Sequence, residues 1–373
     1  MNATEAGKIR VLYLVSRLQR HGPIFQLYNI VRYLDRTRFC PRVATLSPEA
    51  RGSLLADFEK LDVECRSLGL SRVGGMIFGP GRIKRLLKER PVDLVHVFDY
   101  RSTLLCANHV KGVPRVVTCR QSYRHVFGPI LGFIMTKTFL RACDKCERVV
   151  AVSNSVRNLI ENGFSRPIDL IHNGIDVGRF KPVGQDQKRH LRSRLGLSPD
   201  KRVFLSVGFL SEAKGVPTLI EAFLKGADGQ SDVLVLLGDG PLREKCSRLA
   251  GGRSNIRLAG FVENVEDYLG AADVFVSASL TEGCPNAVME AMACGLPVVL
   301  SDIPAHREIL AFDERAGQMF PVNDVAALSE ILSDMADTGC SEPSGAGLSI
   351  IENHLNARKM SLKYQGLYAE LNG

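Results

Sequence analysis

The sequence lacks the segments that would insert it into a membrane or direct it out of the cell. No uncharged apolar run approaches the roughly 18 residues that a membrane-spanning helix needs, and the longest, Val126–Thr136, is too short. The first residues, Met1–Lys8, contain no apolar core with a cleavage site, so we expect no signal peptide. Low-complexity tracts and short-period repeats are missing as well. These absences favour a globular protein of the cytoplasm.

Patterns for metals and disulfides are also scarce. The ten cysteines are mostly isolated, and the one close pair, Cys143 and Cys146, has neither a second pair nor a flanking histidine. No Asp-x-Asp pattern is placed to hold magnesium. We therefore expect no metal, with zinc at the cysteine pair as the alternative, and the isolated thiols fit a reducing compartment.

Negative charge is scarce in the first half of the chain. Residues 1–180 contain 29 Lys/Arg against 15 Asp/Glu, a net charge of +14, whereas residues 181–373 contain 19 against 25, a net charge of −6. This asymmetry predicts that the first half faces an anionic partner, with a solvated basic surface as the alternative. No nucleic-acid-binding module accompanies the charge, so we expect no nucleic acid partner.

Short apolar runs typical of buried parallel strands alternate with helical spacing along the whole chain, which predicts doubly wound parallel sheets. The alternation restarts after a polar linker near residue 185, so we expect two domains, 1–185 and 186–347, and a closing helix, 348–373, that could pack back on the first domain. The expected strands are Ile9–Val15, Pro41–Leu46, Val92–Phe98, Arg115–Cys119 and Arg148–Val152, then Val203–Val207, Val233–Leu237, Ile256–Ala259, Val274–Val276 and Pro297–Ser301.

The stretch Ser279–Ser301 carries the most chemistry. A strand ends there, Pro285 opens a helix, and Gly295 closes it. The first N–H groups of that helix would form an anion site. Two carboxylates, Glu282 and Glu290, stand beside this site, where they could accept hydrogen bonds from sugar and ribose hydroxyls. In the alternative, neither acid binds a ligand: Glu282 is favoured by the helix dipole, and Glu290 lies on the solvent-exposed face of the helix.

This stretch resembles the E-x(7)-E motif of retaining glycosyltransferases of family 4, with Glu282 and Glu290 as its acids. The resemblance implies the GT-B fold, in which two Rossmann-like domains face each other across a cleft. It also implies retaining transfer from a nucleotide-diphosphate sugar, the co-substrate, with no cofactor required. Further motifs agree in order: Val207–Leu210 with Lys214 and Gly215, Leu237–Pro241, Phe261–Phe275, Val152 and Ser153, and Ile171–Asp176 with Phe180.

The family resemblance also implies roles for individual residues. Lys214 and Glu282 would be catalytic, with Lys214 near the diphosphate, Glu282 on the donor sugar and Glu290 on the ribose. On the acceptor side of the cleft we expect Gly22, Arg120 and Asn173. The donor site as a whole would comprise Gly208, Lys214, Gly238, Gly240, Phe261, Val262, Glu282, Gly283, Cys284, Pro285, Asn286, Ala287 and Glu290.

Three positions depart from the family pattern. Phe209 stands where the family usually has an arginine. Arg120 stands near the position where the family often has a histidine, and Gly22-Pro23 replaces the family's usual glycine pair. A catalytically weakened nucleotide-sugar-binding relative and a sugar-nucleotide epimerase of the same fold therefore remain as alternatives to a transferase.

The expected acceptor is a glycan or a lipid-linked molecule, as for polysaccharide or glycolipid synthesis. The first half combines an apolar segment, Val126–Thr136, with basic flanks, the pattern of a segment that binds an anionic membrane surface. In the alternative, Ile130, Phe133, Ile134 and Leu140 pack into the core of the first domain. The further cations are Arg82, Lys84, Arg85, Lys88 and Arg90, then Arg115, Arg120, Arg124, Lys137, Arg141, Lys145 and Arg148.

Overall fold

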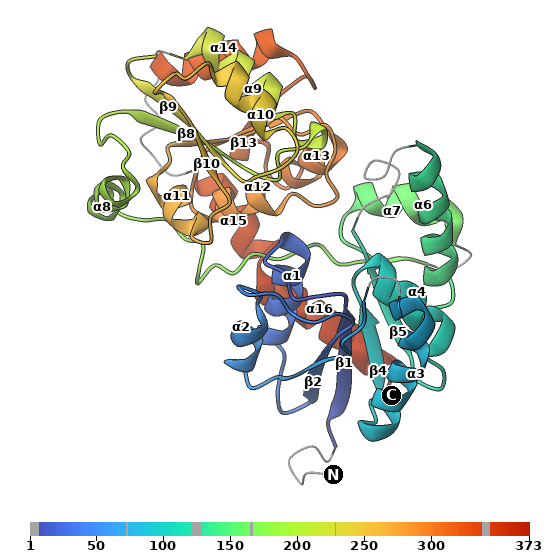
Figure 1. Cartoon of the computed structure of the whole chain (residues 1–373). Helices are drawn as coiled ribbons and strands as arrows, with labels where there is room; N and C mark the ends of the chain where they lie inside the picture. The colour runs from blue at the N-terminus through green and yellow to red at the C-terminus, as the bar shows by residue number, and fades with distance from the viewer. Residues whose placement is uncertain (1–6, 72–73, 121–128, 165–166, 228, 338–343) are drawn as a thin grey trace. The chain divides into compact units, whose positions relative to one another are not determined.

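The computed structural model describes residues 7–71, 74–120, 129–164, 167–227, 229–337 and 344–373 (Figure 1). These residues form two compact units. The first comprises Met1–Gly174 together with Ala357–Gly373, and the second comprises Ile175–Asn356. Each unit is an α/β fold around its own parallel sheet, as the alternating pattern predicted.

The sheet of the first unit has the strand order β3-β2-β1-β4-β5-β6-β7. Its central strands are buried on both faces, which is why they read as continuous apolar runs. The order reverses between β1 and β4, and in open sheets the crevice at such a point binds ligands. The strands are β1 Ile9–Val15, β2 Phe39–Thr45, β3 Glu64–Ser67, β4 Leu94–Val97, β5 Arg115–Cys119, β6 Arg148–Ala151 and β7 Asp169–Leu170.

The crossover helices of this unit follow the strands in turn. Helix α4 begins where Asp99 caps it in a capping box with Ser102, and α6 packs on α4 through the stacked rings of Phe139 and Tyr100. The helices are α1 Gly22–Arg32, α2 Leu55–Glu59, α3 Gly74–Glu89, α4 Tyr100–His109, α6 Pro129–Cys143, α7 Asn154–Ile160, η2 Glu161–Gly163 and α16 Ala357–Glu370.

The single closing helix expected from residue 348 onward is wrong, because the segment is two helices. Helix α15, Gly345–Asn353, belongs to the second unit, and α16 belongs to the first. The break has a physical cause: Ile175 donates its N–H to the carbonyl of Leu355 at 2.8 Å and forms an isolated bridge with Asn356. Helix α16 then lies beside α1, where Ser361 donates to the carbonyl of Ile30 (Figure 1).

The sheet of the second unit has the strand order β10-β9-β8-β11-β12-β13 and reverses between β8 and β11. Its strands are β8 Arg202–Val207, β9 Asp232–Leu237, β10 Ile256–Gly260, β11 Val274–Ser277, β12 Val298–Ser301 and β13 Gly317–Phe320. Its helices are α8 Gln185–Leu195, η3 Glu212–Lys214, α9 Val216–Gly226, α10 Arg243–Ala250, α11 Val265–Ala271, α12 Asn286–Ala293, α13 Pro304–Leu310, η4 Glu314–Ala316, α14 Val325–Asp337 and α15.

Candidate active site

Two loops of the second unit meet at the carboxyl ends of β8 and β11, where the strand order reverses. Gly215 ends the β8 loop with φ +58°, and a Cβ there would lie 2.0 Å from the carbonyl oxygen of Ala278. Leu280 also donates its N–H to the carbonyl of Ala213 at 2.8 Å. The β8 loop is therefore held against the β11 loop by backbone contact that only glycine permits.

The loop after β9 is locked to the β8 loop in the same way. Gly238 has φ +124°, and a Cβ there would lie 1.9 Å from the carbonyl oxygen of Gly208. Leu210 donates its N–H to the carbonyl of Asp239 at 2.9 Å. Gly208, Gly238 and Gly240, all predicted as site residues, thus lie together at this edge of the sheet.

The two predicted catalytic side chains are in direct contact. The Lys214 ammonium lies 2.5 Å from Oε1 of Glu282, and Ser279 donates its hydroxyl to the same oxygen at 2.8 Å. The side chains of Lys214 and Glu282 are 28% and 13% exposed, so the ion pair is only partly hydrated. A small pocket adjoins it, lined by Ser206, Val207, Gly208, Leu210, Lys214, Val216, Leu236, Leu237, Ser277 and Ser279.

A buried polar chain continues behind Ser279. Ser301 donates its hydroxyl to the carbonyl of Ser279 at 2.5 Å, and Nδ1 of His306 lies 2.8 Å from the carbonyl of Ser301. Because that carbonyl can only accept, Nδ1 carries a proton. Burial lowers the pKa of His306, so the ring is neutral at physiological pH. Sequence reasoning missed all three residues, although the Ser277–Ser279 hydroxyls directly precede the recognised motif.

Helix α12 begins at Asn286, and Pro285 caps it instead of occupying its first turn. The first N–H groups of a helix have no acceptor within it, so those of Asn286 and Ala287 favour an anion at this end. The helix ends at Ala293 with Cys294 as its C-cap, and Gly295 follows with φ +78°, as predicted for a glycine stop.

Glu290 lies on α12, and its side chain is half-buried. Burial raises the pKa of Glu290 to about 7, while the nearby Arg179 opposes the rise and Glu266 adds to it. Arg179 is itself paired with Glu266 at 2.7 Å. A carboxyl group with this pKa can both donate and accept hydrogen bonds at neutral pH.

Two exposed rings flank β9 at the same edge of the sheet. Phe209 follows β8 and is 63% exposed, and Phe261 follows β10 and is 62% exposed. Val262 is half-buried and packs on the core beneath. An exposed aromatic ring offers a stacking surface to a planar ligand, and Phe209 supplies no charge.

The predicted acceptor-side residues lie in the first unit. Gly22 begins α1, and Arg120 follows β5 with its guanidinium 4.8 Å from the ring centre of Phe98. Burial and the charge of Arg120 lower the pKa of His21. Asn173 is buried beside Gly174, and the N–H of Gly174 donates to Oε1 of Gln26 at 3.0 Å. Arg124 and the first residues of the predicted apolar segment, 126–128, lie outside the described residues.

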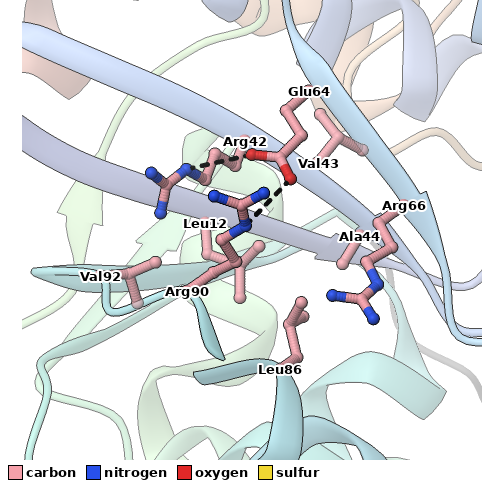
Figure 2. Close-up of a pocket in the computed structure, with 9 residues that line it drawn as sticks. All are labelled: Leu12, Arg42, Val43, Ala44, Glu64, Arg66, Leu86, Arg90 and Val92. Atoms are coloured by element: carbon pink, nitrogen blue, oxygen red, sulfur yellow. Dashed lines mark ion pairs between the residues drawn. The ribbon is translucent and has the colours of Figure 1, made fainter. Parts of the chain in front are cut away.

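A second pocket opens in the first unit between β2, β3 and the end of α3 (Figure 2). Figure 2 shows Arg42 and Arg90 pointing toward Glu64, which lies 3.5 Å from each. Arg66, also on its wall, pairs with Glu89 at 2.9 Å. The pocket contains none of the predicted site residues, and its one lining carboxylate, Glu64, already pairs with Arg42 and Arg90.

Among the residues that the structure describes, no group of three or more His, Cys, Asp or Glu side chains could hold a metal ion. Within the same residues, no helix is long and apolar enough to cross a membrane. Cys143 and Cys146 are both buried, and the Cys143 sulfur lies 3.9 Å from that of Cys119.

Two family models match the chain, one in each half. The model described as "Glycosyltransferase Family 4" matches residues 25–179, and that described as "Glycosyl transferases group 1" matches residues 201–338. The putative glycosyltransferase EpsF of Bacillus subtilis is 36% identical over 326 residues, which is 79% of each chain. The chain therefore belongs to the glycosyltransferase family that these two models describe.

Other relatives of this glycosyltransferase differ in how far they match. The UDP-Gal:alpha-D-GlcNAc-diphosphoundecaprenol alpha-1,3-galactosyltransferase of Escherichia coli is 28% identical over 88% of this chain and 87% of its own. The chain spans 66% of an uncharacterized glycosyltransferase of Methanocaldococcus jannaschii and 56% of the putative teichuronic acid biosynthesis glycosyltransferase TuaC of Bacillus subtilis.

The fold of this glycosyltransferase is also that of solved structures. Anabaena HepE, in complex with UDP and glucose, has a TM-score of 0.81 at 18% identity, covering 97% of this chain and 100% of HepE. Sucrose-phosphate synthase from Thermosynechococcus elongatus has a TM-score of 0.78 over 98% of this chain and 99% of that one. The predicted fold class, GT-B, is confirmed.

Proposed function

We propose that this glycosyltransferase moves a sugar from a nucleotide-diphosphate sugar, with retention of configuration, to a glycan or lipid-linked acceptor in polysaccharide or glycolipid synthesis. The observation that carries the proposal is the contact of Lys214 with Glu282 beside the start of α12. A cation, a carboxylate and a helix N-terminus then meet at the point where parallel sheets bind ligands.

Each of these groups has a part in the proposed reaction. As the bond to the sugar breaks, negative charge grows on the diphosphate, and Lys214 with the first N–H groups of α12 would stabilise it. Glu282 would accept hydrogen bonds from sugar hydroxyls. Glu290 would both donate hydrogen bonds to the ribose hydroxyls and accept hydrogen bonds from them. Retention is supported by the family resemblance, and a β-linked product from an α-linked donor, seen by proton NMR, would contradict it.

The relatives support the substrate classes. The Escherichia coli relative is named for a UDP-sugar donor and a diphosphoundecaprenol-linked acceptor, and HepE is complexed with UDP-glucose in another structure. By analogy, a UDP-sugar donor and a lipid-linked acceptor at the cytoplasmic face of a membrane are the first substrates to test.

The donor site can be tested by thermal denaturation with UDP-, GDP- and ADP-sugars. One class of donor should stabilise the wild type, by about 2.7 kcal/mol at a hundredfold excess over its dissociation constant. Lys214→Ala should abolish most of this stabilisation and of turnover, because the diphosphate charge loses its cation.

The matched control is Lys225→Ala, an exposed lysine at the end of α9 in the same unit. It should leave donor binding unchanged. Stabilisation by none of the three donor classes, or equal effects of the two lysine variants, would contradict the proposed donor site.

We further propose that the first unit binds an anionic membrane surface through α6. Ile130, Phe133 and Ile134 are 78%, 52% and 53% exposed, and Lys137 and Arg141 are exposed further along the helix. The alternative, in which these three apolar side chains pack into the core, is wrong. Leu140 alone is half-buried, and it lies against Gly163. An exposed apolar face with cations beside it is what interfacial binding needs.

A further inference from the structure

The lysine proposed to meet the diphosphate forms an ion pair with a neighbouring carboxylate. The ammonium of Lys214 lies 2.5 Å from Oε1 of Glu282. Because both side chains are largely shielded from water, this attraction is stronger than that of a surface ion pair. Phe209 adds no cation to the same loop. A diphosphate therefore has to compete with Glu282 for the charge of Lys214.

The Glu282 carboxylate is also held in place. Ser279 donates to the same oxygen at 2.8 Å, and the carbonyl of Ser279 is fixed in turn by Ser301 at 2.5 Å. The backbone contact between Leu280 and Ala213 joins the two loops that carry the pair. Glu282 therefore stays near any diphosphate that approaches Lys214, and its negative charge repels that ligand.

We propose that Glu282 lowers the affinity for free nucleotide diphosphate and so favours the nucleotide sugar over the leaving product. This inference rests on the proposed donor site. The sugar of an intact donor brings hydroxyls that donate to Glu282, so its carboxylate stays satisfied while Lys214 turns to the diphosphate. A free nucleotide diphosphate lacks the donor sugar and its hydroxyls. Its charge therefore meets a Glu282 carboxylate that has lost Lys214 and gained no hydrogen bonds in exchange. The site thus selects the donor by charge competition and releases the product.

The test is Glu282→Gln, which removes the charge and keeps the shape and a hydrogen-bond acceptor for Ser279. Titration calorimetry would compare UDP, GDP and ADP with their sugar derivatives on wild type and variant. We expect the variant to bind the free nucleotide diphosphate about tenfold more tightly, and its preference for the nucleotide sugar to collapse. A merely structural role of Glu282 would weaken both ligands together.

Two further variants make the result decisive. Glu221→Gln, on the exposed face of α9, makes the same charge change in the same unit and should leave both affinities unchanged. Glu282→Asp withdraws the carboxylate by one methylene and should shift the preference in the same direction by less; it replaces Glu282→Gln if that variant does not fold. Unchanged or weaker binding of nucleotide diphosphate by the folded variant overturns the inference alone. If the wild type binds none of these ligands, the proposed function itself fails, and the inference with it.

Discussion

Glu290 combines burial with a predicted contact to ligand hydroxyls. Its pKa is raised to about 7 from an ordinary value of 4.5, because burial disfavours the charged form. The native state therefore binds a proton more tightly than the unfolded chain does. The stability that this group contributes is fully present below pH 4.5 and is lost as the pH rises through 7. Donor binding would recover part of the loss by giving the carboxylate hydrogen-bond partners.

We predict that Glu290→Gln stabilises the donor-free protein increasingly between pH 4.5 and 7, because glutamine carries no charge to desolvate. The gain should level off above pH 7 at about 3 kcal/mol or less, since the side chain keeps some contact with water. Urea denaturation at several pH values measures it. Glu221→Gln should show no such trend, and a pH-independent difference for Glu290→Gln would refute the assigned pKa.

At the scale of elements, the turn after β9 depends on two glycines, Gly238 and Gly240. Any side chain at Gly238 would need φ +124° and would bring its Cβ to 1.9 Å from the carbonyl of Gly208. The β8 and β9 loops would have to separate, and with them the floor of the candidate site. We therefore expect this turn to couple the stability of the second unit to donor binding.

We expect Gly238→Ala to lower the free energy of unfolding by at least about 2 kcal/mol and to weaken donor binding, because the backbone must shift. Gly366→Ala is the matched control: this glycine is exposed within α16 and has open space around it. There alanine should stabilise by roughly 0.5–1 kcal/mol. Urea denaturation and donor titration measure both variants, and wild-type stability and affinity in Gly238→Ala would disprove the tight contact.

The central strands and one edge strand, β10, could be predicted from sequence, whereas the edge strands β3, β7 and β13 could not. Strands such as β1 and β8 are apolar because both of their faces are covered, whereas β3 reads Glu-Cys-Arg-Ser and β13 is half-exposed. An edge strand needs no apolar run, so composition does not reveal it. The break before α16 was missed for another reason: it depends on pairing with Ile175, which is distant in sequence.

The candidate site was predictable only in part. Glu282 and Lys214 could be named from motifs, but their contact follows from the neighbouring positions of β8 and β11 in the sheet. Ser301 and His306 were missed because β12 and α13 bring them behind Ser279 from a later part of the chain. The raised pKa of Glu290 likewise depends on burial, which spacing alone does not reveal.

At the scale of the whole molecule, the first half of the chain combines a positive net charge with a helix that exposes several apolar side chains. Its net charge is +14 over residues 1–180, and α6 exposes apolar side chains on one face. Each cation near an anionic lipid surface contributes about 1 kcal/mol, and buried apolar side chains add to this. Together they would be sufficient for the proposed reversible binding, which would bring the enzyme to a lipid-linked acceptor.

We predict that the wild-type protein co-sediments with anionic but not neutral vesicles at low salt and is released at high salt, because screening removes the charge attraction. Replacing Phe133 and Ile134 together by serine should weaken this binding at least about tenfold, since two apolar side chains no longer enter the headgroup boundary. Leu362→Ser is the matched control, because Leu362 is 56% exposed but lies on α16. If the wild type does not bind anionic vesicles at low salt, or if the control loses binding equally, the membrane proposal is wrong. The basic first half of the chain would then be expected to bind an acidic acceptor instead.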